Sequence, residues 1–461
     1  MKKHSGKIII LILIFGIFQK ANAQTIGTLD PAKKIKIPQP ATFSNQNILN
    51  NYNGTYQPTT PSIYNPNLSI QQRNALLIQQ ANQQNRRRQQ SQQLINEALA
   101  EFKNKNNSSE IIYNLPANKN ITGTNYYQKA FRKLSEMDEN NYSVKDATFI
   151  IENAYHQGKE NKDAFDKIIK QTGRFLLDKM DEFGYDKNSN VAKNFILFQF
   201  FADTLHVKGN NLKHLPITYD FNDYMGKKDW SKMFVTKLLF SNQGQCNSMP
   251  RLYMILAEEI GAEAFLSLSP NHSYIRFRDE NNYWYNVELT NQMFTTNSMI
   301  LGSGYIKSEA LQNKIYMSNL TKKELLSLLL VDLANGYVQK FGYDEFVKQI
   351  AHKALKLNPN SINANMLYSN YLTYKFEYNA HKLGINPRNN QELQKIRFYP
   401  KIVDLLHQVN TQYKKIDNLG FEPMPKEAYK NWLNSLKKAK EKQENKEIQQ
   451  HFKLKLKSFK D

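Results

Sequence analysis

The residues of this 461-residue chain that could carry out chemistry are grouped around Cys246, its one cysteine. It ends the polar run Ser241-Asn-Gln-Gly-Gln-Cys246, just before a segment with strong helical periodicity. Thiolate is the reactive form of cysteine, and the unpaired N–H groups of a helix N-terminus favour negative charge. His272 and Glu288 follow on two predicted strands. This order suggests a thiol nucleophile, a base and a carboxylate that orients the base.

The elements that must position these residues can be read from the pattern of apolar side chains. After Cys246, apolar residues recur at i, i+3, i+4 and i+7, which predicts a helix of about four turns. Pro250 falls in its first turn, where a missing N–H does no harm, and Gly261 marks its end. Three β-rich runs follow, at 264–268, 272–278 and 283–289, the last two joined as a hairpin by the polar turn 279–282.

This layout resembles the transglutaminase-like superfamily of papain-type thiol enzymes, whose core runs from a Cys-bearing helix to a His strand and an Asp strand. The matching motifs are Gly244-Gln-Cys246, Leu256 to Gly261 with Ala262-Glu-Ala264, Asn271-His272, and Trp284-Tyr-Asn-Val-Glu288-Leu-Thr290. The resemblance covers residues 216–312. It implies an α+β fold with the Cys-bearing helix packed on a small antiparallel sheet. It also implies that Cys246 is the nucleophile, His272 the base and Glu288 the third member of a triad, where the family usually has aspartate.

In this interpretation His272 generates the Cys246 thiolate, which attacks a carboxamide or peptide carbonyl, and the imidazolium protonates the departing amine. Hydrolysis by water is favoured over transamidation by a lysine amine. The Cys246 backbone N–H is the first candidate for an oxyanion donor, and the side chains of Gln245 and Gln243 are further candidates. The candidates for lining the site are Asn247, Asn271, Trp284 and Asn286.

A non-catalytic scaffold is the alternative. A lone cysteine is often an inert small residue of a core, and some bacterial relatives of this family that carry tetratricopeptide repeats lack the cysteine altogether. In that interpretation the fold and its repeats bind a protein or cell-envelope partner. An active site needs an accessible sulfur within reach of the His272 ring, whereas a scaffold accommodates a buried, ordinary thiol.

The N-terminal residues predict export. Lysines precede the apolar run Ile8 to Phe18, and Ala21-Asn-Ala23 fits a cleavage site, so residues 1–23 are predicted to be a signal peptide. No cysteine lies near this site to accept a lipid. We therefore expect a periplasmic or extracellular protein that is not a lipoprotein. No later run approaches the roughly 18 apolar residues of a transmembrane helix, so none is expected in the mature chain.

The net charge of +21 is compatible with an anionic cell-envelope polymer as a partner, beside a protein or peptide substrate. Nucleic acid is not expected, because no motif interleaves aromatic with basic residues and lysine far outnumbers arginine. The nine histidines are scattered and no paired-Cys or His-Glu-x-x-His motif occurs, so no metal site is expected. There is no glycine-rich phosphate loop, and a cofactor-free reaction is the consistent interpretation.

Composition divides the remaining chain. Residues 24–107 are rich in Asn and Gln and are expected to be largely disordered. Apolar stripes predict helices through 122–215, including one that starts near Ser143 and a third that runs from Phe195 to Leu205. A further helix over 229–239 should lead into the cysteine turn.

The C-terminal part is predicted to begin with helical hairpins. Thr321 and Glu324 form a capping box, and the run Ala351-His-Lys-Ala354-Leu-Lys-Leu-Asn-Pro359 resembles a tetratricopeptide repeat, so residues 318–420 are expected to form helical hairpins of that type. The Lys-rich stretch 421–461 is expected to be a solvated helix or tail.

Overall fold

The computed structural model describes residues 113–208 and 212–440, together with the single positions 79, 85, 86, 89 and 93. The predicted signal peptide, almost all of the 24–107 segment and the end of the chain after 440 lie outside the described residues. Among the described helices, none combines the length and the apolar character needed to cross a membrane.

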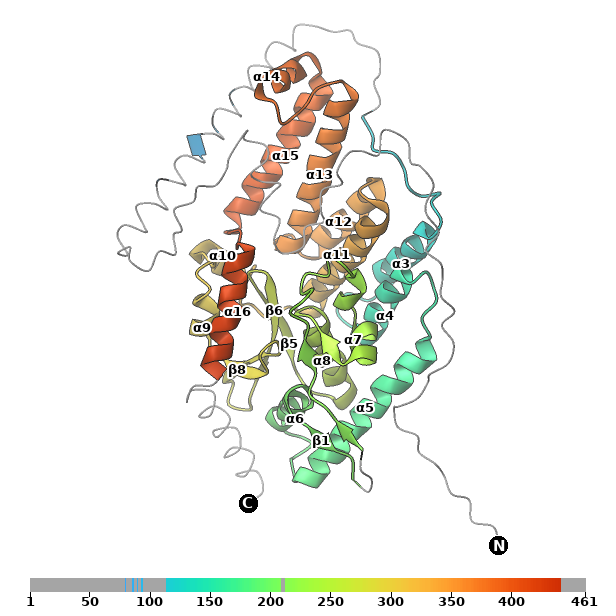
Figure 1. Ribbon diagram of the computed structural model, residues 1–461, viewed down its shortest axis with the longest axis vertical. Helices are drawn as coiled ribbons and strands as arrows, with labels where there is room; N and C mark the ends of the chain where they lie inside the picture. Colours follow the sequence, from blue (N-terminus) through green and yellow to red (C-terminus); the bar gives the residue numbers. More distant parts are fainter. Residues whose placement is uncertain are drawn as a thin grey trace. The chain divides into compact units, whose positions relative to one another are not determined.

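A four-stranded antiparallel sheet forms the framework of the candidate site (Figure 1). Its strands lie side by side in chain order: β5 (Phe265–Ser269), β6 (His272–Arg278), β7 (Trp284–Glu288) and β8 (Met293–Thr295). The predicted hairpin is the β6–β7 pair, in register Arg276 to Asn286. The outer edge of β5 is covered, because the N–H groups of Met317 and Leu320 donate to its carbonyls.

The predicted helix after the cysteine is α8 (Ser248–Ile260), which packs against β5 and β6. It ends at Gly261, whose φ of 65° lies in the left-handed region that glycine adopts freely. Almost every residue of α8 is buried, so the helix is enclosed on all sides. Helices and a small antiparallel sheet together make an α+β protein, the predicted class.

The chain before the sheet is helical, as predicted. Its helices are α3 (Thr124–Glu136), α4 (Val144–Tyr155), α5 (Lys162–Phe183) and α6 (Asn190–Ala202). Ser143 caps α4 by accepting a hydrogen bond from the Asp146 N–H. The helix predicted to reach Leu205 ends earlier, because Leu205 belongs to β1 (Leu205–His206), which pairs with β2 (Lys213–His214).

The single helix predicted over 229–239 is wrong. A 3-10 helix, η2 (Trp230–Met233), is followed by extended Phe234 and then by α7 (Val235–Ser241). The carboxylate of Glu152, which is buried in α4, accepts hydrogen bonds from the first two N–H groups of α7 at 2.7 and 2.8 Å. This distant side chain caps a new helix start. α7 leads into β4 (Gln243–Gly244), which pairs in parallel with β3 (Thr218–Tyr219).

Beyond the sheet the chain is helical again. The elements are α9 (Asn297–Leu301), α10 (Ser308–Gln312), α11 (Lys322–Phe341), α12 (Glu345–Leu357), α13 (Ile362–Lys382), α14 (Asn390–Leu393), η3 (Gln394–Phe398) and α15 (Pro400–Asn418). The predicted capping box at Thr321 and Glu324 is present at the start of α11. α11 packs on α12, α12 on α13 and α13 on α15. Ala351 and Ala354 of the repeat-like run are fully buried.

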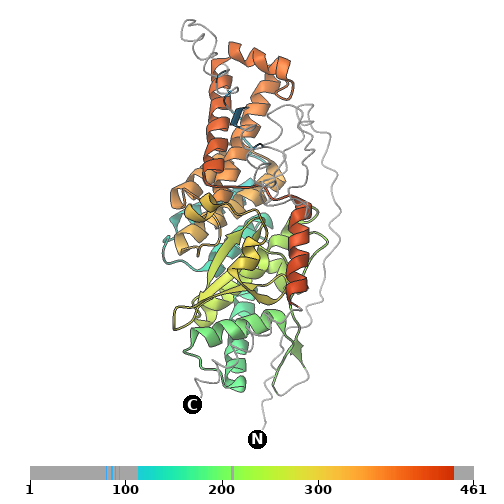
Figure 2. The same cartoon turned by 90° about the vertical axis from the view of Figure 1, so that its left-hand side faces the viewer.

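The last described helix, α16 (Lys426–Lys440), is not the solvated helix predicted from its lysines. It lies beside α9 and the sheet, as the two views in Figures 1 and 2 agree. Its buried side chains recur at i, i+3, i+4 and i+7, and they are Tyr429, Trp432, Leu433 and Leu436. Lys426, Lys430, Lys437 and Lys438 are exposed.

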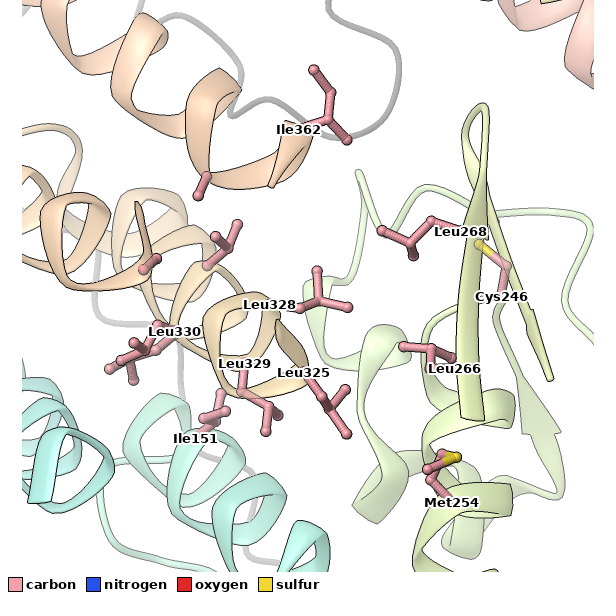
Figure 3. Packing of buried hydrophobic residues seen from close by; sticks show 14 of the residues in the cluster. Ile151, Cys246, Met254, Leu266, Leu268, Leu325, Leu328, Leu329, Leu330 and Ile362 are labelled. Atoms are coloured by element: carbon pink, nitrogen blue, oxygen red, sulfur yellow. The ribbon is translucent and has the colours of Figure 1, made fainter. Parts of the chain in front are cut away.

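One hydrophobic cluster joins the helices before the sheet, the sheet and the helices after it. Figure 3 shows Leu325 and Leu328 of α11 facing Leu266 and Leu268 of β5. Cys246 belongs to the same cluster. The candidate site is therefore built onto a core that all three regions share.

Candidate active site

Cys246 precedes α8 by one residue, with Asn247 as the N-cap. Two hydrogen bonds fix its turn. The Gln245 N–H donates to the Ser248 hydroxyl at 2.9 Å, and the Ser273 hydroxyl of β6 donates to the Cys246 carbonyl. The position of the thiol is therefore set both by α8 and by the strand that begins with the candidate base.

Gly244 precedes this turn at a place where there is no room for a side chain. A Cβ atom there would stand 2.4 Å from Met249 Cγ and 2.6 Å from Leu238 Cδ1. These separations are far shorter than van der Waals contact. The glycine thus allows α7 and α8 to approach each other closely at the cysteine.

His272 and Glu288 lie at the same end of the β6–β7 hairpin and on the same face. His272 is the first residue of β6, placed there by a turn in which Asn271 takes a φ of 57°, a value that Asn tolerates better than most residues. Glu288 is the last residue of β7. Since Arg276 pairs with Asn286 and alternate residues share a face, both side chains project together.

The two side chains form a short, buried hydrogen bond. His272 Nε2 lies 2.5 Å from Glu288 Oε2, and both side chains are at most 2% exposed. The second carboxylate oxygen accepts the Thr290 N–H at 2.7 Å. Glutamate, one methylene longer than the aspartate usual in the family that the sequence resembles, therefore reaches the imidazole here and is held in one orientation.

Charge in this pair favours the protonated ring. Burial lowers the pKa of His272, but the Glu288 carboxylate and hydrogen bonds to Cys246 and Glu288 outweigh it and raise that pKa to about 10. The ring is consequently an imidazolium at neutral pH, with Glu288 as its counter-ion.

The thiol interacts with the imidazole ring, but it is not accessible. Its sulfur lies 4.0 Å from the Asn271 carbonyl oxygen, at the outer limit of a sulfur hydrogen bond, and it also contributes to the raised pKa of His272. Cys246 is only 6% exposed. The accessible sulfur that an active site requires is therefore absent in this structure.

The cover over the triad comes from α16. Tyr429 Oη lies 3.2 Å from His272 Nδ1, the ring nitrogen that Glu288 leaves unused. The Trp432 ring meets the imidazole edge to face, with centroids 5.2 Å apart. The Trp432 indole N–H donates to the Met299 carbonyl of α9 at 3.2 Å. The C-terminal helix thus supplies two aromatic walls to the site.

A second phenol, Tyr219 of β3, lies beside these groups. Its hydroxyl is 3.4 Å from that of Tyr429. Burial, and after it the charge of Cys246, raises the pKa of both phenols well above the usual value. Both therefore stay neutral at physiological pH and act as hydrogen-bonding groups.

Neither glutamine takes the predicted oxyanion position. Gln245 is fully buried, and its amide nitrogen donates to the backbone carbonyls of Asp220 and Asp223 at 3.3 and 3.1 Å. Because both amide hydrogens are used, Gln245 is a positioning residue for the 220–223 loop. Gln243 is exposed on β4, the short strand before the cysteine turn. The Cys246 N–H is the candidate donor that remains.

Of the four predicted lining residues, only Asn271 contacts the site, since its backbone carbonyl meets the thiol and its amide donates to the Met424 carbonyl at 3.0 Å. Asn247 points away from the triad to the Met233 carbonyl and to Asp332 of α11.

Trp284 and Asn286 share the face of Glu288 but lie further along β7. The Arg276 guanidinium stacks on Trp284 at 5.1 Å and donates to Asn286 at 3.1 Å. Trp284 is four residues from Glu288, or roughly 13 Å along an extended strand. These two side chains therefore form a separate cluster on the sheet.

The residues beside the candidate site that sequence reasoning missed are those of α16 and β3. Tyr429, Trp432, Leu433 and Leu436 show the i, i+3, i+4, i+7 spacing of a buried helix face, so a signal was present. It was outweighed by the lysines around it. For Tyr219, on a strand of two residues, no local pattern exists.

No group of three or more His, Cys, Asp or Glu side chains suited to a metal ion occurs in the part of the chain that the structure describes. Comparisons of the chain with protein-family models, curated proteins and solved structures found no match.

Proposed function

We propose that this chain is an exported thiol enzyme with a transglutaminase-like core that acts on amide bonds of proteins or peptides. One observation carries the proposal: the buried His272 ring is held by Glu288 at 2.5 Å, and the next residue, Ser273, donates a hydrogen bond to the Cys246 carbonyl. This is the arrangement of nucleophile, base and orienting carboxylate that covalent acyl transfer requires.

The reaction follows from the charges. The imidazolium of His272 favours the Cys246 thiolate, which adds to the carbonyl carbon of an amide and forms a C–S bond. The carbonyl oxygen becomes an oxyanion beside the Cys246 N–H. As the C–N bond breaks, His272 gives its proton to the departing amine and leaves a thioester. His272 then takes a proton from water as the water attacks the thioester, the C–S bond breaks, and a carboxylic acid leaves while the thiolate and the imidazolium are restored.

Hydrolysis is the favoured outcome, and an amine in place of water would give transamidation. The helices α11–α15 would form a tetratricopeptide-like platform beside this core, suited to a polypeptide partner. The exposed lysines of α16 would suit an anionic cell-envelope polymer. The predicted signal peptide supports a periplasmic or extracellular place of action.

The alternative is a scaffold that uses the same fold without catalysis. The observation that favours it is the burial of Cys246, which an inert core cysteine would share. The two functions differ in the reactivity of the thiol when it meets a reagent, because only an enzyme requires an activated sulfur.

The deciding experiment is the rate of iodoacetamide alkylation between pH 5 and pH 9, with each rate divided by that at pH 9. This ratio reports ionisation of the thiol and cancels differences in access. An ordinary thiol, with a pKa near 8.5, reacts roughly 200-fold more slowly at pH 6 than at pH 9. We expect less than a tenfold difference in the wild type.

His272→Ala should restore the steep profile of an ordinary thiol, and His407→Ala, on the exposed surface of α15, should not. A wild-type profile that falls as steeply as that of His272→Ala would refute the enzyme and favour the scaffold. Since Cys246 is the one cysteine of the chain, the label reports on this site alone.

A further inference from the structure

We propose that α16 is an autoinhibitory cover, which must leave the triad before any substrate can reach Cys246. This inference rests on the proposed function and concerns the regulation of the same site. The three residues proposed to act on a substrate are all buried: Cys246 is 6%, His272 0% and Glu288 2% exposed. A peptide bond of a separate molecule cannot reach a sulfur in that state.

The contacts of α16 are directed at the reacting groups. Glu288 occupies Nε2 of His272, so Nδ1 is the nitrogen available to exchange a proton with the thiol or the departing amine. Tyr429 Oη stands 3.2 Å from that nitrogen. A neutral phenol there takes the place that the reacting amide must occupy. Tyr429 is thus a blocking residue and has no role in the reaction.

The remaining contacts of α16 with the site are weaker than those within the core. The hydroxyl groups of Tyr429 and Tyr219 are 3.4 Å apart, and the Asn291 amide is 3.4 Å from the Leu433 carbonyl. Both distances lie beyond the usual range for such hydrogen bonds. The helix is held mainly by four apolar side chains on one face, while Lys426, Lys430, Lys437 and Lys438 lie on the exposed surface. Such an amphipathic element can detach without breaking the core.

The chain before α16 is anchored, which defines where the helix would pivot. Gly420 packs so closely against the backbone of α10 that a Cβ atom there would stand 2.3 Å from the Ala310 nitrogen. Lys307 forms an ion pair with Glu422 at 2.5 Å. The Asn271 amide holds the Met424 carbonyl at 3.0 Å. Within the described residues beyond Met424, α16 is held by its apolar face, by the hydrogen bond from the Trp432 indole to the Met299 carbonyl at 3.2 Å, and by the two 3.4 Å contacts above. A swing of α16 about Pro425 would therefore open the site and leave α15 and the sheet in place.

The test is the alkylation rate of Cys246 in the full-length chain at pH 9, where an accessible thiol is largely ionised whether or not it is activated. Trp432→Ala removes the largest side chain of the cover, and we expect at least a tenfold faster rate than in the wild type. Asn434→Ala, at an exposed position of the same helix, should leave the rate unchanged. Leu367→Ala, in the buried core of α13, controls for general destabilisation.

Equal rates for the wild type and Trp432→Ala would overturn the proposal, and so would an equal acceleration by Leu367→Ala. A second measurement tests whether the faster reaction comes from loss of the cover or from a local folding defect. A synthetic peptide of residues 421–440, added to Trp432→Ala protein, should slow alkylation again, whereas the same peptide carrying Trp432→Ala should not. Failure of the first peptide to slow the reaction would also count against the cover.

The experiment distinguishes failure of the cover from failure of the proposed enzyme function. Acceleration at pH 9 reports access alone. If Trp432→Ala reacts faster at pH 9 but its rate falls about 200-fold by pH 6 as for an ordinary thiol, the cover is real and the triad is not activated. If its rate at pH 9 is unchanged while the profile stays shallow, the triad is activated and α16 is not its cover.

Discussion

Replacing Glu288 with glutamine removes the charge of the carboxylate and keeps its size. An amide can still accept the hydrogen bond from the Thr290 N–H, so the local geometry is retained. In the wild type, burial lowers the pKa of His272 but Glu288 and the hydrogen bonds raise it from 6.5 to about 10. A difference of about 3.5 pKa units corresponds to on the order of 5 kcal/mol in favour of the imidazolium.

Because the pKa of His272 is raised in the folded protein, its contribution to the free energy of unfolding decreases as the pH rises. The stabilisation by His272 is fully present below about pH 6.5, the pKa of the unfolded chain, and is lost as the pH rises towards about 10. In Glu288→Gln, burial is no longer opposed by a carboxylate, so the ring should be neutral in the folded protein at pH 7. We expect a loss of on the order of 3–5 kcal/mol at pH 6 and little difference from the wild type near pH 10.

The assay is urea unfolding at pH 6, 8 and 9.5, followed by tryptophan fluorescence. The wild-type free energy of unfolding should fall between pH 6 and pH 9.5 by more than that of the variant. Glu263→Gln is the matched control, because its carboxylate pairs with Arg278 at the surface, where both side chains are about half exposed. That exposed pair should contribute less than about 1 kcal/mol. Parallel pH profiles for wild type and Glu288→Gln would refute the buried ion pair.

Two further predictions concern the elements that hold the site. Gly244→Ala would place a methyl group against Met249 and Leu238, and should lower the free energy of unfolding by roughly 1–3 kcal/mol and alter the alkylation rate of the neighbouring cysteine, as measured by urea unfolding and iodoacetamide labelling. Thr321→Ala removes the capping box with Glu324 and should cost about 1 kcal/mol in urea unfolding, whereas Thr321→Ser should cost less than half of that; equal losses would show that the hydroxyl is not the cap.

The sequence predicted those parts of the site that depend on local patterns. The helix that ends at Gly261 and the strand that starts at His272 are where periodicity and turn residues put them. Alternation along β7 also placed Glu288 on a definite face. These predictions succeed because helix and strand periods are properties of a short stretch of chain.

Predictions that depended on a distant partner failed. The helix over 229–239 is broken because the Glu152 carboxylate, from a different helix, caps the N–H groups that start α7. Gln245 was expected to face a substrate, but carbonyls of the 220–223 loop take both of its amide hydrogens. The order of residues in the chain does not show that the α7 N–H groups bond to the Glu152 carboxylate, or that the Gln245 amide bonds to the loop carbonyls.

The sequence by itself determined which residues could do chemistry and on which elements they lie, because composition and periodicity are local. Only the tertiary structure decided that His272 meets Glu288 at 2.5 Å and that Tyr429 stands at the other ring nitrogen. The second contact joins residues 157 positions apart in the chain. The lysines of α16 indicate a helix at the surface, but which of its faces is buried, and against what, is set by side-chain packing on the completed sheet.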